Sequence, residues 1–327
     1  MKAFLNLIRW PNLLIIILTM VLMRYAVIEP LLSKIDVILL HGSGEATRMT
    51  LQFPLFQFML LVAATLLITA AGYVINDYFD IRTDLINRGE VIVGTKITRR
   101  KAMMWHTIFN ITGVGAGFYI SWRAGYFWLG TLYLIVSGLL YFYSASYKRQ
   151  FLVGNLMVAL LTALVPLLVV FYEWPALYRY YMLNAVTLPD FNLIFYWVGG
   201  FALFAFLLTL SREIIKDIED FEGDKAQGRN TVPVVTGIRG ARIIAASINI
   251  IITALLFIVW YFAINDRITV IYLILLIALP LLYVVYQLLI SRNSEQLHIA
   301  SRYMKLVMFT GILYSLVVKA ILTWNLF

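Results

Sequence analysis

Long apolar runs recur through almost the whole chain, and they limit what it can fold into. A run of roughly 20 apolar residues, wound as a helix, spans the hydrocarbon core of a bilayer. Of the 327 residues, 62% are hydrophobic and only 13% are charged, too few to cover a soluble protein of this size. We therefore expect an all-α, polytopic membrane protein whose residues 1–327 form a single transmembrane domain. The nine expected spans lie at approximately 11–29, 53–80, 103–122, 125–146, 151–172, 191–210, 241–264, 268–290 and 303–325.

The basic residues are unevenly divided between the two sides of these spans. With the N-terminus inside, 19 of the 26 Lys and Arg residues fall on its side and seven on the other. Cytoplasmic loops of membrane proteins carry the excess of Lys and Arg, so the side with 19 is predicted to be cytoplasmic. This distribution accounts for the net charge of +9 without a nucleic-acid partner. We expect an integral protein of the inner membrane of a bacterial or archaeal cell.

The first of two acidic clusters lies at the predicted cytoplasmic end of the second span. Asn76, Asp80 and Asp84 recur every four residues, so a helix places them on one face. A frayed helix end leading into a polar loop is the simpler interpretation. It accounts poorly for carboxylates, because the helix dipole favours cations at that end. Ionisable groups at the edge of a span are usually functional, and we expect the same here.

The second acidic cluster follows the sixth predicted span. Asp220 and Asp224 repeat the spacing of four, and Asp217 lies one turn earlier. At ~4 Å and an effective dielectric constant of ~20, each pair of like charges costs roughly 4 kcal/mol. We therefore expect a cation among these carboxylates. Oxygen ligands suit a hard ion such as Mg²⁺, and the absence of cysteine excludes thiolate metal sites. The expected Mg²⁺ ligands are Asn76, Asp80, Asp84, Asp217, Asp220 and Asp224.

Basic residues near both clusters favour a phosphate or diphosphate as the partner of this ion. Arg212 and Lys216 share one helical stripe with Asp220, where they could hold a diphosphate oxygen. The same two residues could instead pair with Asp217. Lys148 follows the fourth span, where an anchor at the membrane surface is an equally good interpretation. The expected diphosphate contacts are Arg88, Lys148, Arg212 and Lys216.

Both clusters resemble motifs of the UbiA superfamily of intramembrane prenyltransferases. The first is similar to that family's Asn-Asp-x-x-Asp-x-x-x-Asp motif and the second to its Asp-x-x-x-Asp motif, and the resemblance covers nearly the whole chain. It implies Mg²⁺-dependent transfer of a prenyl group from an isoprenyl diphosphate to a lipidic or aromatic acceptor, by an enzyme embedded in membrane lipid. It also implies that Asp80, Asp84 and Asp220 are catalytic. Because both acidic clusters fall on the side with the excess of basic residues, we expect the active site to face the cytoplasm.

Residues 211–224 are most similar to the branch of this family that prenylates a glycerol-phosphate lipid. The implied donor is geranylgeranyl diphosphate, and the implied acceptor is the hydroxyl of a lipidic glycerol phosphate. The loop after the first motif departs from the family pattern, because no proline follows Arg88. An aromatic acceptor, as in quinone biosynthesis, is the alternative. A cation-coupled transporter is an alternative of another class, but transporters place ionisable groups near the middle of their spans.

Overall fold

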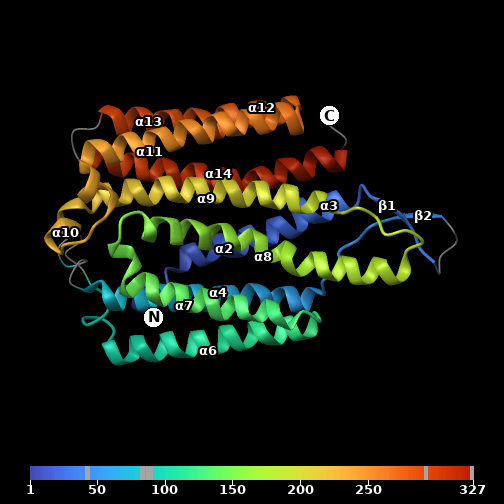
Figure 1. Cartoon of the computed structure of the whole chain (residues 1–327), viewed down its shortest axis with the longest axis horizontal. Helices are drawn as coiled ribbons and strands as arrows, with labels where there is room; N and C mark the ends of the chain where they lie inside the picture. Colours follow the sequence, from blue (N-terminus) through green and yellow to red (C-terminus); the bar gives the residue numbers. More distant parts are fainter. Residues whose placement is uncertain (41–44, 82–84, 86–90, 291–293, 325–327) are drawn as a thin grey trace.

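The computed structural model describes residues 1–40, 45–81, 85, 91–290 and 294–324, and most of these belong to helices that run side by side (Figure 1). The first half of the chain forms α1 (Lys2–Leu7), α2 (Trp10–Leu22), α3 (Glu29–Leu32), α4 (Leu55–Phe79), α6 (Arg99–Arg123), α7 (Gly130–Ala145) and α8 (Val153–Asn184). The second half forms α9 (Leu193–Glu219), α10 (Phe221–Ala226), α11 (Val232–Val259), α12 (Arg267–Tyr272), α13 (Leu279–Ile290) and α14 (Ser294–Trp324).

Short irregular segments complete these helices. Wider π-helical turns at Met23–Ile28, Trp260–Ile264 and Leu273–Ala278 continue α2, α11 and α12 without a break, and tighter 3₁₀ turns cover Phe127–Leu129 and Tyr147–Arg149. Strands β1 (Asp36–Ile38) and β2 (Ala46–Arg48) pair antiparallel in a small hairpin. The hairpin lies at the opposite end of the bundle from α10 (Figure 1).

The prediction of an all-α membrane protein is confirmed. Within the described residues, eight helices or continuous helical segments are long and apolar enough to cross a bilayer. The remaining expected span, 103–122, corresponds to α6, which is less apolar than the others but packs along α4 and α7. In Figure 1, α4, α6 and α7 form one side of the bundle, α2, α8 and α9 the middle, and α11, α13 and α14 the other side.

Several helices extend well beyond the expected spans. Residues 173–190 were expected to connect two spans, yet α8 continues to Asn184, and α9 continues to Glu219. Apolar composition marks only the part of a helix that lies in hydrocarbon, whereas backbone hydrogen bonds extend a helix equally well into water. The extension of α9 matters for function, because it carries Asp217 and ends at Asp220, two members of the second acidic cluster.

A buried ion pair fixes the chain where it enters α4. Arg24 and Glu173 are both almost completely buried, with 3.9 Å between the guanidinium and the carboxylate. Glu173 Oε1 accepts hydrogen bonds from the backbone N–H groups of Gln52 (2.6 Å) and Phe53 (2.9 Å), and Arg24 donates to the Phe53 carbonyl. The pair thus ties α2 and α8 to the start of the helix whose far end carries Asp80.

Candidate active site

The helices α4 and α9 end in the same way, each with an aspartate. Asp80 follows α4 with φ −91° and ψ 5°, and Asp220 follows α9 with φ −90° and ψ 9°. Each backbone N–H still bonds to the carbonyl four residues earlier, that of Asn76 for Asp80 and that of Lys216 for Asp220. Each helix therefore places a carboxylate against its own negative dipole end, where a cation is required to stabilise it.

The two acidic clusters meet in one small polar pocket of about 60 Å³. Helix α4, the segment between α7 and α8, the end of α9 and α10 all contribute side chains to it. The structure therefore brings six of the expected site residues together. The pocket is lined by Asn76, Asp80, Tyr143, Lys148, Gly154, Asn155, Glu213, Asp217, Asp220, Asp224, Arg229 and Thr231.

Two cations connect the carboxylates of this pocket. Lys148 Nζ lies 2.7 Å from Asp80 Oδ1 and 3.2 Å from Asn76 Oδ1, to which it donates a hydrogen bond. Arg229 donates through one Nη to Asp80 Oδ1 (2.9 Å) and through the other to Asp224 Oδ1 (3.2 Å). Arg229 thus joins the first acidic cluster to the second.

Burial and these ion pairs shift the pKa values of the charged groups in the pocket in opposite directions. Burial alone would raise the pKa of Asp80, but the charges and hydrogen bonds of Lys148 and Arg229 hold that pKa below its usual value. Burial lowers the pKa of the Lys148 ammonium to about 8, although Asp80 favours the charged form. Burial raises the pKa of Asp224, against the opposite effect of Arg229. The first cluster is therefore the better neutralised of the two.

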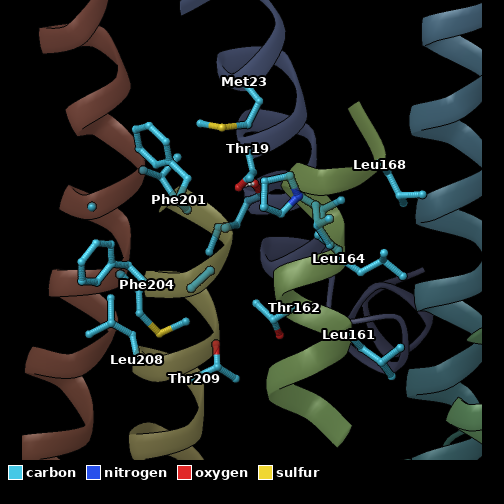
Figure 2. A pocket seen from close by; sticks show the side chains of 18 of the residues that line it. Thr19, Met23, Leu161, Thr162, Leu164, Leu168, Phe201, Phe204, Leu208 and Thr209 are labelled. Carbon is cyan, nitrogen blue, oxygen red and sulfur yellow. Dashed lines mark hydrogen bonds between the residues drawn. The ribbon is translucent and has the colours of Figure 1, made fainter. Parts of the chain in front are cut away.

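A much larger cavity of about 820 Å³ lies next to this pocket. The two share Asn76, Tyr143 and Glu213, so the polar pocket lies at one end of the cavity. Apolar side chains form most of its wall. Figure 2 shows part of that wall, with Phe201, Phe204 and Leu208 on α9 and Leu161, Leu164 and Leu168 on α8.

The remaining expected site residues fall elsewhere. Arg212 lines the large cavity, and its guanidinium pairs with the Glu213 carboxylate at 2.8 Å. Lys216 lies 3.7 Å from the other oxygen of Glu213 and lines neither cavity. Both were expected to contact the diphosphate beside Asp220, but the structure places neither in the acidic pocket. Asp84 and Arg88 lie outside the described residues.

Arg229, Asn155 and Glu213 are among the pocket side chains that the sequence did not single out. Arg229 was counted only as one of many basic loop residues, and its spacing of five from Asp224 gives no helical signal. Asn155 Nδ2 donates to Asp217 Oδ2 (2.8 Å), a contact between α8 and α9. Glu213 is buried beside two cations of its own helix. Of the aromatic residues, Tyr143 reaches both cavities, whereas Tyr141 lines neither.

The chemistry of the pocket fits a hard divalent cation. Apart from Lys148 and Arg229, its polar side chains offer oxygen atoms from carboxylates, amides and hydroxyl groups, the ligands that Mg²⁺ prefers. Within the described part of the chain, however, no three carboxylate or imidazole groups converge closely enough to form a ready-made metal site. The two basic side chains, Lys148 and Arg229, hold the carboxylate of Asp80 instead.

Comparison with known proteins finds similarity to one family of enzymes. Residues 43–317 match the UbiA prenyltransferase family. The chain is 33% identical to the digeranylgeranylglyceryl phosphate synthase of Methanosphaera stadtmanae over 73% of this chain and 79% of that protein. It is 32% identical to the enzyme of the same name from Methanobrevibacter smithii, over 82% of this chain and 87% of that protein.

Solved structures share the fold at lower identity. A UbiA homologue from Aeropyrum pernix superposes with a TM-score of 0.60 at 16% identity, over 90% of this chain and 97% of that one. A structure described as that of digeranylgeranylglyceryl phosphate synthase gives 0.56 at 22% identity, over 96% and 98% of the two chains. The family match covers far more than half of the sequence. The chain therefore belongs to the UbiA prenyltransferase family.

Proposed function

We propose that this protein transfers a prenyl group from an isoprenyl diphosphate to the hydroxyl of a lipidic glycerol phosphate, with Mg²⁺ as cofactor. One observation carries the proposal: the pocket that holds Asp80, Asp220, Lys148 and Arg229 lies at the end of a large apolar cavity. A diphosphate needs basic side chains and a metal ion held by oxygen ligands, and a prenyl chain needs an apolar wall. The molecule provides both, side by side.

The residues of the pocket have distinct tasks in this reaction. Lys148 and Arg229 bind the diphosphate, and the carboxylates of Asp80, Asp220 and Asp224 hold the metal. When bound there, Mg²⁺ supplies charge neutralisation to the leaving diphosphate. Asn76 and Asp217 complete the set of oxygen donors. Asp84 and Arg88 remain candidates for the same two tasks.

The large cavity holds the prenyl chain and excludes water. As the bond between C1 and the diphosphate oxygen breaks, its electron pair leaves with the diphosphate and C1 becomes cation-like. The Tyr143 ring, which lines both cavities, is the aromatic group that we assign to stabilising this carbon. The acceptor oxygen then bonds to C1, and its proton passes to the released diphosphate.

The comparisons support this choice of donor, cofactor and acceptor. Two relatives that share about a third of their residues with this chain are digeranylgeranylglyceryl phosphate synthases. A UbiA homologue of the same fold from Archaeoglobus fulgidus, with a TM-score of 0.52 at 18% identity, has been solved with DMAPP and Mg²⁺. The excess of basic residues on the side of the acidic pocket supports a cytoplasmic active site.

Incubation of the purified protein with geranylgeranyl diphosphate, Mg²⁺ and a panel of acceptors tests the proposal. The panel contains a glycerol phosphate lipid with one prenyl chain, 4-hydroxybenzoate and a hydroxynaphthoate. We expect a prenylated product from the glycerol phosphate lipid alone. Turnover of an aromatic acid without any turnover of the lipid would replace the acceptor and leave prenyl transfer standing. No product from any acceptor would contradict prenyl transfer itself.

A further inference from the structure

We infer that the side of the large cavity formed by α9 and α14 binds the acceptor, and that Arg212 and Lys305 hold the acceptor phosphate. The inference rests on the proposed function and adds the location of the second substrate. The acceptor we assign to this surface is a glycerol phosphate that carries one lipid chain.

Helix α9 presents a cation followed by an apolar stripe along the cavity wall. Arg212, Leu208, Phe204 and Phe201 succeed one another at spacings of four, four and three residues, which places them on one face of the helix. All four line the cavity. From the end of the bundle that carries the acidic pocket, this face therefore begins with a guanidinium and continues with large apolar side chains.

Helix α14 repeats this arrangement next to α9. Lys305, Phe309 and Ile312 line the cavity at spacings of four and three residues, again with the cation nearest the acidic end. The two helices pack against each other, and Lys305 lies within electrostatic reach of Arg212 and Lys216. Two neighbouring helices thus offer a cationic head and an apolar groove, the complement of a lipid phosphate.

The charges at this position call for an anion. Glu213 is shared between Arg212 (2.8 Å) and Lys216 (3.7 Å). Within the described part of the chain, Lys305 takes part in no ion pair or hydrogen bond. Glu219 is the other carboxylate near it, and Glu219 pairs with His298 at 3.2 Å. A phosphate monoester carries about −1.5 to −2 charges at neutral pH and would neutralise this excess better than an aromatic carboxylate.

The donor has a separate place in the same cavity. Asn76 on α4 and Tyr143 on α7 connect the acidic pocket to the side of the cavity formed by α4, α7 and α8. In Figure 2, Leu161, Leu164 and Leu168 extend from α8 to one side of the view, whereas Phe201, Phe204 and Leu208 extend from α9 to the opposite side. The two apolar surfaces can therefore accommodate two lipid chains whose heads meet near Glu213.

Steady-state kinetics of Lys305→Gln test this assignment. Arg212 already pairs with Glu213, whereas Lys305 forms no ion pair within the described residues, and this variant removes only the charge of Lys305. With geranylgeranyl diphosphate as donor, we expect the KM for the glycerol phosphate lipid to rise about tenfold, because a charge-assisted hydrogen bond is lost. The donor KM is expected to remain unchanged, since the acidic pocket is untouched.

A second acceptor makes the test specific to the phosphate. The same lipid without its phosphate, a prenylglycerol, should be a poor acceptor for the wild-type protein. Lys305→Gln should not weaken it further, because the partner of Lys305 is already absent. Lys305→Arg, which keeps the charge, should retain the wild-type KM. Arg302→Gln is the matched control, an exposed cation on the same helix that does not line the cavity.

Three results would overturn the inference. The first is a Lys305→Gln variant whose acceptor KM is unchanged. The second is an increase in the donor KM instead of the acceptor KM. The third is an equal loss with the phosphate lipid and with the prenylglycerol, which would indicate a structural role. Each of these leaves the proposed function intact, provided that the wild-type protein prenylates the phosphate lipid. Failure of the wild-type protein to do so would overturn the proposed function and this inference together.

Discussion

Arg229 donates to the carboxylate of Asp80 at 2.9 Å although 149 residues separate the two in the sequence. Its other Nη donates to Asp224, so one guanidinium connects the end of α4 to α10. Only Arg can hold two carboxylates in this way, because its planar fork presents donors in two directions. The contact makes the two halves of the acidic pocket a single unit.

Replacement of Arg229 by Lys is expected to impair catalysis nearly as much as replacement by Gln. A lysine ammonium is a point charge and cannot hold both carboxylates in the fixed fork geometry. We expect kcat/KM for the donor to fall by about 10- to 100-fold, the equivalent of one or two lost charge-assisted hydrogen bonds. Arg239→Lys, at an exposed position on α11, serves as the control. Wild-type kinetics for Arg229→Lys would show that the bridge is dispensable.

Asp80→Asn and Asp220→Asn are each expected to abolish prenyl transfer while the protein still inserts and folds. Each acidic cluster supplies only part of the oxygen ligands, so neither suffices alone. Asparagine keeps the shape of the side chain and removes the charge that holds the metal. Glu222→Gln, an exposed neighbour on α10, should remain active. If either Asn variant transfers prenyl groups at the wild-type rate, its cluster does not bind the metal.

Removal of divalent cations is expected to stop the reaction. The pocket offers oxygen donors from both acidic motifs and the chain contains no cysteine, so Mg²⁺ or Mn²⁺ should restore activity after treatment with EDTA. Product formation from labelled geranylgeranyl diphosphate is the measurement. Full turnover in excess EDTA is the result that the metal mechanism cannot accommodate.

Cysteine labelling can establish the orientation in the membrane, because the natural chain contains no cysteine. Single cysteines at Lys96 and Glu222 should react with an impermeant maleimide only after the cells are opened. A cysteine at Thr47 in the exposed strand β2 should react in intact cells. This pattern follows from the excess of basic residues on the side of the acidic pocket. The reverse pattern would place the active site outside.

Glu173→Ala is expected to reduce the free energy of unfolding by about 3–5 kcal/mol, because Arg24 then remains buried without its counter-ion. Thermal unfolding in detergent is the measurement. The matched control is Glu29→Ala, whose partner Lys319 is 3.8 Å away; both side chains are about half exposed, so the loss of this pair should change little. Equal unfolding temperatures for the two variants would contradict a stabilising role for the buried pair.

The fold could largely be predicted from the sequence because hydrocarbon selects for apolar composition. Each expected span corresponds to a helix, and only α6 is less apolar than the rest, since it begins with three basic residues and includes His106 and Asn110. The helix ends were predicted less well. The last turns of α8 and α9 are polar, and helical hydrogen bonds continue there without any signal in hydropathy.

The candidate site was predictable only where local spacing specifies it. Asp80 and Asp220 stand at helix ends that the sequence places on one side of the membrane, so their meeting was expected. The contacts of Arg229 and Asn155 depend on how distant segments pack, which one sequence does not reveal. Arg212 and Lys216 share a helical stripe with Asp220 as expected, but their side chains pair with Glu213 of the same helix instead of entering the acidic pocket.

The division between helix ends and helix middles has a consequence for how such enzymes diverge. In the proposed reaction, the chemistry depends on a few charged groups where α4 and α9 end, whereas the lipid chains contact apolar residues farther along the same helices. Substitutions among those apolar residues, such as Leu208 or Phe204, can alter which lipid is accepted while the charged groups stay in place. A descendant of this chain could acquire a new acceptor by conservative exchanges alone, with no loss of the parental reaction along the way.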